Sequence, residues 1–304
     1  MKIVRTISEV RDVLDDARRR GRSVGFVPTM GALHDGHRSL VRRAREENDL
    51  VCVSIFVNPT QFGPNEDLDA YPRPLDDDLA ACEHDGVDIV FVPDDAELYP
   101  RALATSVRVS TLTDHLEGAH RPGHFDGVTL IVTKLFNIVG RCRAYFGEKD
   151  AQQLRVIRRM VSDLNIPVHA VGCRTVREAD GLAMSSRNAY LEPDDRERAR
   201  CLSQALFAIR DAVTAGERDV AALLQIGHGH LKAADEVDYL AIADPDDLHH
   251  VDHVDGGVLV LGAVRIGSTR LIDNVPVDVG ARPRVPAAMS FAGLDDDDNR
   301  PVES

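Results

Sequence analysis

The chain alternates short apolar segments rich in β-branched residues with longer segments whose apolar positions recur at helical spacing. The short apolar segments predict buried strands at 24–28, 51–57, 87–93, 143–146 and 168–171. The segments with helical spacing predict helices at 37–47, 75–85, 130–139 and 152–163. Such alternation predicts an α/β domain, residues 1–176, built on a parallel sheet with helices on both faces. Ligands bind beyond the carboxyl ends of the strands in such sheets.

The pattern changes after residue 176. A polar segment, 177–188, precedes two predicted helices, and three strands follow them. The helices are expected at 194–215 and 219–234, and the strands at 237–243, 256–267 and 269–275. Helices followed by strands predict a smaller α+β domain over residues 177–280. Residues 281–304 are rich in Pro and Asp with little apolar periodicity, which predicts a disordered tail.

Composition narrows the class of protein. With 304 residues, 43 % of them hydrophobic and 28 % charged, the chain is typical of a soluble two-domain protein. The net charge of −14 argues against nucleic acid as a partner. Five scattered cysteines without a CxxC pair fit free thiols in a reducing cytoplasm. The N-terminus lacks the apolar segment of a signal peptide, and no apolar run approaches a membrane span, so a cytoplasmic protein without a membrane partner is expected.

The strongest chemical signal is the segment PTMGALHDGH, residues 28–37, where the first predicted strand gives way to a helix. Gly31 and Gly36 let the backbone turn or approach a ligand closely. The free N–H groups at a helix start bind phosphate, and His34 and His37 can donate hydrogen bonds to its oxygens. This arrangement suits negative charge that develops on an α-phosphate. The alternative is a tight turn with two incidental histidines.

Two further segments are less specific. NPTQFG, residues 58–63, follows the second strand and offers the amides of Asn58 and Gln61, which can read a carboxylate and a hydroxyl together. The alternative is a polar turn. In YPRPLDDD, residues 71–78, the acids complement a helix dipole, or else Asp77 and Asp78 hold Mg²⁺.

Charged residues also occur farther along the chain. The segment 121–128 is predicted as a loop, and Lys134 in the following apolar helix either reaches the surface or points into a site. FGEKDAQQ, residues 146–153, offers Lys149 and Gln153 after a strand, with a simple helix cap as the alternative. MSSR, residues 184–187, could clamp phosphates. The C-terminal histidines lack ligand spacing and are predicted to be surface residues, namely His228, His230, His249, His250 and His253.

Taken together, these segments resemble the pantothenate synthetases, a family of pantoate–β-alanine ligases. PTMGALHDGH, FVNPTQF, YPRPLDDDL, RPGHFDGV, YFGEKDAQQ and VREADGLAMSSRN occur here in the family's order, and the resemblance covers roughly residues 3–280. The HxGH and MSSR elements are also similar to signatures of the wider nucleotidyltransferase group, which uses a Rossmann-like domain. The resemblance implies an AMP-forming carbon–nitrogen ligase of pantothenate (vitamin B5) and coenzyme A biosynthesis. Such an enzyme condenses (R)-pantoate with β-alanine through a pantoyl-adenylate, with ATP as substrate, and releases AMP and pyrophosphate.

The resemblance also implies roles for individual residues. The ATP site would comprise Met30, Gly31, Ala32, Leu33, His34, Asp35, Gly36, His37, Gly147, Glu148, Lys149, Asp150, Val176, Met184, Ser185, Ser186 and Arg187. The catalytic residues among them would be His34, His37, Lys149, Ser185, Ser186 and Arg187. Gln61 would bind pantoate beside β-alanine, Gln153 would hold pantoate, and Asp77 and Asp78 would bind Mg²⁺. Residues 1–176 would then be a Rossmann-like ATP- and pantoate-binding domain, residues 177–280 a lid domain, and the protein a homodimer.

Two positions depart from the family pattern. Ala151 stands where an aromatic residue is expected after KD, and Ala81 where some relatives have a polar side chain near the acids. These departures bear on the metal site and leave the activity unaffected. The alternatives are another nucleotidyl-transfer enzyme, such as a cytidylyltransferase or a tRNA synthetase-like protein, and a nucleotide-binding module without catalysis.

Overall fold

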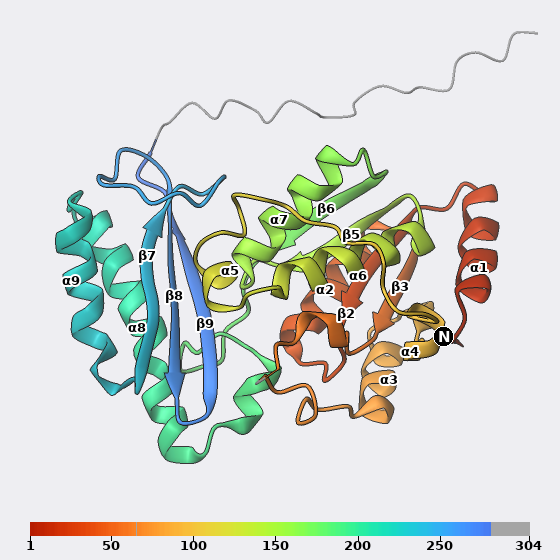
Figure 1. The fold of residues 1–304 in the computed structure, drawn as a ribbon, viewed down its shortest axis with the longest axis horizontal. Helices are drawn as coiled ribbons and strands as arrows, with labels where there is room; N and C mark the ends of the chain where they lie inside the picture. Colours follow the sequence, from red (N-terminus) through yellow and green to blue (C-terminus); the bar gives the residue numbers. More distant parts are fainter. Residues whose placement is uncertain (65, 281–304) are drawn as a thin grey trace, which may run out of the picture.

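A six-stranded parallel sheet forms the centre of the first part of the chain (Figure 1). The computed structural model describes residues 1–64 and 66–280, so the tail predicted at 281–304 lies outside the described residues. The strand order is β1-β4-β3-β2-β5-β6. The strands are β1 (Lys2–Val4), β2 (Val24–Thr29), β3 (Leu50–Ile55), β4 (Ile89–Phe91), β5 (Cys142–Gly147) and β6 (Val168–Cys173).

Helices cover both faces of this sheet, and the alternation of side chains along the strands explains why. On β2, Phe26 packs in one apolar cluster and Val27 in another, because successive side chains of a strand point to opposite faces. The Phe26 cluster includes side chains of α1 (Ile7–Arg19), α6 (His124–Val139) and α7 (Ala151–Asp163). The Val27 cluster includes side chains of α2 (Asp35–Glu47) and α3 (Leu75–His84). The predicted fold class is therefore confirmed for this part of the chain.

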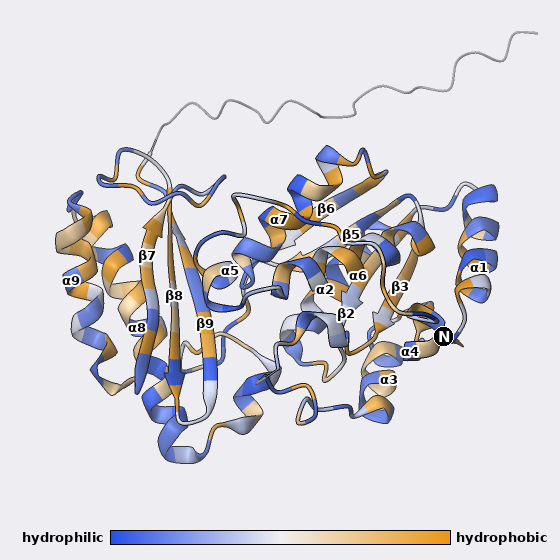
Figure 2. Ribbon diagram, viewed as in Figure 1, coloured by the Kyte–Doolittle hydropathy of each residue, from blue (hydrophilic) through white to orange (hydrophobic). Residues whose placement is uncertain are grey.

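A smaller antiparallel sheet follows in the order β7-β8-β9. Its strands are β7 (Glu236–Ala243), β8 (Val258–Ile266) and β9 (Thr269–Val277), and they come after α8 (Pro193–Thr214), α9 (Val220–His230) and the 3-10 turn η3 (Leu231–Ala233). Val260 packs with Leu206 of α8, whereas its neighbour Leu261 packs with Ala151 of α7. The sheet is thus apolar on both faces and lies between α8 and the first part of the chain (Figures 1 and 2).

A buried ion pair links the smaller sheet to a short helix in the first part of the chain. Arg270 of β9 donates to both carboxylate oxygens of Glu117, at 2.6 and 2.8 Å, and Glu117 belongs to the short helix α5 (Glu117–His120). The Tyr239 hydroxyl donates to the same carboxylate at 2.8 Å. Burial raises the pKa of Glu117, but Arg270 and Tyr239 outweigh this effect and hold the pKa below its ordinary value. Glu117 is therefore ionised, and its pair with Arg270 holds α5 against the smaller sheet.

The elements that the sequence did not predict include two at the N-terminus, and the start of one helix was also missed. β1 and α1 lie at the N-terminus, and α1 begins with a capping box of Thr6 and Glu9, a signal that the sequence does contain. The prediction of a loop over 121–128 is wrong from His124 onward, because α6 begins there rather than at Leu130. Gly123, with φ of 81°, starts this helix through a left-handed turn that apolar periodicity does not reveal.

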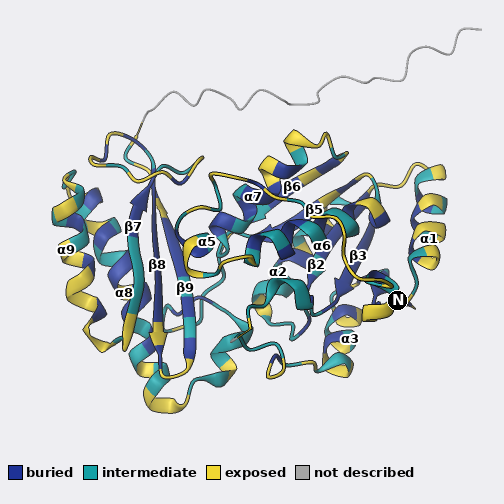
Figure 3. Ribbon diagram, in the orientation of Figure 1, coloured by how far each residue is buried: buried dark blue, intermediate teal, exposed yellow. Residues whose placement is uncertain are grey.

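The side chains left open by the sequence are now placed. Lys134 lies with its ammonium 5.2 Å from the ring centroid of Tyr99, a cation–π contact on the side of α6. The five C-terminal histidines are exposed as predicted. Figure 3 shows exposed positions along α9, the helix that carries His228 and His230. All five cysteines are free and buried, and burial raises the pKa of each thiol, to about 12 for Cys82 and Cys142. In the described part of the chain no helix is long and apolar enough to cross a bilayer.

Candidate active site

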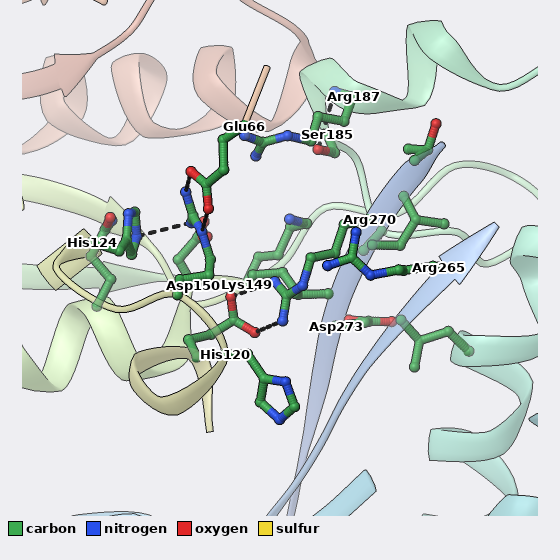
Figure 4. Close-up of a pocket in the computed structure, with 18 of the residues that line it drawn as sticks. Glu66, His120, His124, Lys149, Asp150, Ser185, Arg187, Arg265, Arg270 and Asp273 are labelled. Atoms are coloured by element: carbon green, nitrogen blue, oxygen red, sulfur yellow. Dashed lines mark hydrogen bonds and ion pairs between the residues drawn. The ribbon is translucent and has the colours of Figure 1, made fainter. Parts of the chain in front are cut away.

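Two adjoining cavities open at the carboxyl ends of the parallel strands, where a sheet of this kind binds its ligands. The smaller cavity measures about 230 Å³ and lies between the ends of β2 and β5, the start of α2 and one side of α6. The larger, about 940 Å³, extends between the parallel sheet and β9. Residues that line both cavities are Arg121, His124, Lys149, Asp150, Gln153, Ser185 and Arg187. Figure 4 shows side chains from both parts of the chain around the larger cavity.

The turn between β2 and α2 is held in shape by a buried carboxylate. Gly31 and Ala32 both adopt positive φ, 83° and 50°. Asp78 of α3 accepts the backbone N–H of Ala32 at 2.9 Å and that of Leu33 at 2.7 Å. These bonds offset the strain of a non-glycine residue in the left-handed region. The sequence pattern could not assign this role to Asp78, because the contact joins segments that are distant in the sequence.

The two acids expected to hold Mg²⁺, Asp77 and Asp78, lie apart from the cavity lining. Both oxygens of Asp78 accept backbone N–H groups, and its side chain is buried. Asp77 is exposed on α3, and neither residue is among the described residues that line the two cavities. No group of three potential metal-ligating side chains occurs in the described ranges either. Asp78 therefore has a structural role in this turn, and the binding of Mg²⁺ by Asp77 and Asp78 stays a prediction.

His34 and His37 form a capping box at the start of α2. Nδ1 of His34 accepts the Gly36 N–H at 3.1 Å, and Nδ1 of His37 accepts the N–H of His34 at 3.4 Å. Because a neutral imidazole that accepts at Nδ1 carries its proton on Nε2, both rings keep an Nε2–H donor. The two ring centroids are 4.1 Å apart, and both residues line the smaller cavity. The helix start thus offers two imidazole donors side by side.

Both histidines are neutral at physiological pH. Burial is the main cause, and the nearby Lys149 ammonium adds to it; together they lower the pKa of His34 to about 4. Burial, His34 and Lys149 lower the pKa of His37 to about 3. Lys149 lines the same cavity as the two histidines. A neutral Nε2–H and an ammonium together form an environment suited to an anionic group.

Lys149 lies in the segment between β5 and α7. The segment is fixed at one end by the Glu148 N–H, which donates to the Cys173 carbonyl at 2.8 Å. It is fixed from the other side by the Asn274 amide of β9, which donates to the carbonyls of Glu148 and Lys149. Two parts of the chain therefore hold the backbone from which the Lys149 side chain extends.

The segment with Met184 to Arg187 closes the site from the other side. The Met184 N–H donates to the Val176 carbonyl at 3.0 Å, and the Ser185 hydroxyl accepts the Arg187 N–H at 3.3 Å at the start of η2 (Ser186–Tyr190). The hydroxyls of Ser186 and Tyr71 lie 3.1 Å apart. Arg187 is already paired with a carboxylate, Asp67, which sequence reasoning missed.

An amide-lined slot adjoins the imidazole pair. Asn58 donates to the Gln61 side-chain oxygen at 3.0 Å and to the Gly127 carbonyl at 3.2 Å, and the Tyr99 hydroxyl donates to Asn58 Oδ1 at 2.7 Å. Gln153 lines the same cavity. The opposite wall is apolar and comes from α6, through Val128, Ile131, Val132 and Leu135. Such a slot suits a small acid that has both polar and branched apolar groups.

Arg121, Glu66 and His124 form a second group that sequence reasoning missed. Arg121 donates to both oxygens of Glu66, at 2.7 and 2.6 Å, and lies 3.0 Å from Nε2 of His124. Burial, together with Arg121, lowers the pKa of His124 to about 4. The RPGH segment carried this signal, but nothing in its spacing pointed to an acid from a distant loop.

Most of the expected site residues are brought together. Those that line the smaller cavity are Met30, His34, Gly36, His37, Gln61, Gly147, Lys149, Asp150, Gln153, Val176, Met184, Ser185, Ser186 and Arg187. Five others lie in the same turns but are not among the described residues that line either cavity: Gly31, Ala32, Leu33, Asp35 and Glu148. Gly31, Ala32 and Leu33 shape the turn through their backbone.

Comparisons with known proteins agree on one family. The sequence model of the family described as pantoate-beta-alanine ligase matches residues 2–276. Pantothenate synthetase of Moorella thermoacetica is 53 % identical over 281 residues, which cover 92 % of this chain and 99 % of that protein. The crystal structure of the Thermus thermophilus enzyme aligns with a TM-score of 0.87 at 50 % identity, covering 90 % of this chain and 99 % of that one.

A more distant structure carries ligands. The Francisella tularensis pantoate-beta-alanine ligase, described as complexed with beta-gamma ATP and beta-alanine, aligns with a TM-score of 0.76 at 34 % identity. The alignment covers 90 % of this chain and 97 % of that one. Fold, cavity chemistry and sequence identity over nine-tenths of the chain lead to the same conclusion: this chain belongs to the pantoate–β-alanine ligase family.

Proposed function

We propose that the two cavities bind ATP and pantoate side by side, so that the chain condenses (R)-pantoate with β-alanine through a pantoyl-adenylate. The observation that carries this proposal is the neighbourhood of the His34–His37 donor pair and an amide-lined slot in one cavity. The imidazoles and Lys149 would face the triphosphate. Gln61 and Gln153 would hold the carboxylate and hydroxyl groups of pantoate, while the apolar wall of α6 would receive its methyl groups.

In the first step, a pantoate carboxylate oxygen attacks the α-phosphorus of ATP. A new oxygen–phosphorus bond forms, the bond to the bridging oxygen breaks, and pyrophosphate leaves with the electron pair. His34, His37 and Lys149 stabilise the negative charge that spreads over the phosphate oxygens. The other groups that would contact phosphate are Ser185, Ser186 and Arg187. Alignment and fixed donors supply most of the rate in such a scheme.

In the second step, the neutral amine of β-alanine attacks the acyl carbon of the adenylate beside Gln61. The carbon–oxygen bond to AMP breaks, AMP leaves with the electron pair, and the amine nitrogen loses a proton to solvent to give the amide. No covalent link to the protein is needed, since pantoate itself carries the activated carbonyl. AMP, pyrophosphate and pantothenate are the products.

The test separates the two steps. Exchange of labelled pyrophosphate into ATP should occur with pantoate alone and without β-alanine. AMP should accumulate only when both substrates are present. An active preparation that shows no pantoate-dependent exchange would exclude the stepwise scheme, while exchange without any AMP release on addition of β-alanine would exclude the ligase reaction.

The remaining expectations also belong to this proposal. Residues 1–176 would bind ATP and pantoate, residues 177–280 would act as the lid, and Mg²⁺ would accompany ATP, with Asp77 and Asp78 as its predicted ligands. A homodimer and a cytoplasmic location rest on the family resemblance, the charge and the free thiols. Light scattering coupled to size-exclusion chromatography should give twice the chain mass, and a monomer at micromolar concentration would remove the dimer from the proposal.

A further inference from the structure

Asn274 is a buried amide that the smaller sheet contributes to the Lys149 segment. Its side chain is on β9, and the residue is only 4 % exposed. Nδ2 donates to the Glu148 carbonyl at 2.9 Å and to the Lys149 carbonyl at 2.8 Å. Both amide hydrogens therefore go to two successive carbonyls of one segment.

Those two carbonyls need a partner from outside the segment. The pairing of β5 with β6 ends at Gly147 and Cys173, and α7 begins only at Ala151. Between these points the backbone has left the strand and has not yet entered the helix. Carbonyls in such a position require bonds from elsewhere when they are buried. Asn274 supplies those bonds, so it helps to fix the backbone from which the Lys149 side chain extends.

Asn274 is itself held in place by its neighbours. Its N–H donates to Asp273 at 2.7 Å, and Asp273 accepts two hydrogen bonds from Arg177, at 2.6 and 2.9 Å. Arg177 also donates to the Asn274 carbonyl at 3.2 Å. Arg177 lies at the start of the segment that leads to Ser185. One pair of β9 residues thus contacts the Lys149 segment and the base of the closing segment.

We propose that Asn274 is a positioning residue for the adenylation step, acting through the Glu148 and Lys149 carbonyls to place the Lys149 ammonium beside His34 and His37. This inference rests on the proposed function, in which Lys149 faces the ATP phosphates. A misplacement of about 1 Å can cost on the order of 10²-fold in rate. The position of β9 relative to the parallel sheet thereby enters the rate of the chemical step.

The test is a double-mutant cycle on pantoate-dependent ATP–pyrophosphate exchange. Lys149→Ala should lower the exchange rate by about 10²- to 10³-fold, as expected when one donor to a developing charge is lost. Asn274→Ala should lower it by roughly 10- to 100-fold. In the Lys149→Ala background the second change should cost no more than about twofold, because the group that Asn274 places is already gone.

A matched control separates positioning from general stability. Asn48 is a half-buried amide that also donates twice, to the Ala44 carbonyl and the Tyr145 hydroxyl, but it does not line either cavity. Asn48→Ala should lower the melting temperature as Asn274→Ala does, yet leave the exchange rate near that of the unchanged protein. If Asn274→Ala does not fold, Asn274→Ser takes its place in the same cycle.

The outcomes distinguish the two proposals. Multiplicative losses in the double variant would overturn the positioning role of Asn274 and leave the ligase function intact. A Lys149→Ala variant with an undiminished exchange rate would overturn the role of Lys149 in the proposed function, and with it this inference. The inference is supported if Asn274→Ala lowers the exchange rate only when Lys149 is present, while Asn48→Ala stays fully active.

Discussion

Asp67 holds Arg187 through two hydrogen bonds, from Nε at 3.0 Å and from Nη2 at 2.8 Å. Both side chains are less than a third exposed. Burial raises the pKa of Asp67, but the guanidinium outweighs this effect and keeps the pKa below its ordinary value. The Asp67 carboxylate therefore occupies the guanidinium group of Arg187, which the proposed function assigns to the ATP phosphates. ATP would have to displace this carboxylate to reach Arg187.

Asp67→Asn should for this reason increase the apparent affinity for ATP. A pair of this exposure is worth about 1 kcal/mol, which corresponds to about a fivefold lower dissociation constant. Calorimetry with a non-hydrolysable ATP analogue measures the change. Asp69→Asn is the matched control, because Asp69 is an exposed acid of the same segment. Weaker ATP binding by Asp67→Asn would show that Asp67 orders the site instead of competing for Arg187.

At position 37, a side chain that keeps a hydrogen-bond donor where His37 has Nε2 should support more activity than a side chain that does not. His37→Ala should lower pantoate-dependent exchange by about 10²- to 10³-fold, while the fold is retained. His37→Gln can place an N–H near the Nε2 position and should retain more activity than His37→Asn, whose shorter amide mimics Nδ1. His230→Ala, an exposed histidine of α9, is the control. Equal activity of the Gln and Asn variants would contradict the assigned tautomer.

Gly127→Ala tests how closely α6 packs on the turn that carries Gln61. A Cβ at this position would lie 2.2 Å from the Thr60 carbonyl oxygen, so the turn η1 (Pro59–Gln61) must move. We expect a loss of about 1–3 kcal/mol in the free energy of unfolding and a raised KM for pantoate, since Gln61 lies on this turn. Gly229→Ala in α9, where a Cβ meets no atom within 4 Å, should be neutral or stabilising. An unchanged KM for pantoate would show that this turn does not take part in pantoate binding.

Stability should fall as the pH drops below about 6.5, the ordinary pKa of histidine. Between that value and the lowered pKa values of about 4 for His34 and about 3 for His37, the unfolded chain binds protons that the folded chain does not. The free energy of unfolding therefore rises with pH across this window and declines as the solution is acidified. Urea unfolding measured across this window should show that the free energy of unfolding changes less steeply with pH in the double variant His34→Gln/His37→Gln than in the unchanged protein. His228→Gln, exposed on α9, should keep the full slope.

The sequence predicted the parts of the fold that depend on local periodicity. Short apolar runs located β2, β3 and β5, because strands with both faces buried are apolar throughout, and helical spacing located α2 and α7, because one face of each helix is buried. It did not reveal that α6 begins at His124, since a left-handed glycine rather than apolar spacing starts that helix. Short elements such as α5 carry too few residues for any period to appear.

The site was predictable where its residues are contiguous in sequence. His34, His37 and Lys149 were expected at strand ends, and they line one cavity. Partners from distant segments were not expected, as with Asp67 for Arg187, because no local spacing encodes a contact that forms only on folding. Asp78 illustrates the same limit, since its buried contacts with the turn after β2 were not expected from the sequence.

The burial of all five thiols has a practical consequence. A raised pKa keeps each sulfur protonated and sheltered, and thiol reagents react with accessible thiolates. The native fold should thus be silent toward maleimides without any cysteine being removed. A cysteine introduced at the exposed Asp69 would then take a fluorophore at one known position, and its emission could follow the approach of nucleotide in real time.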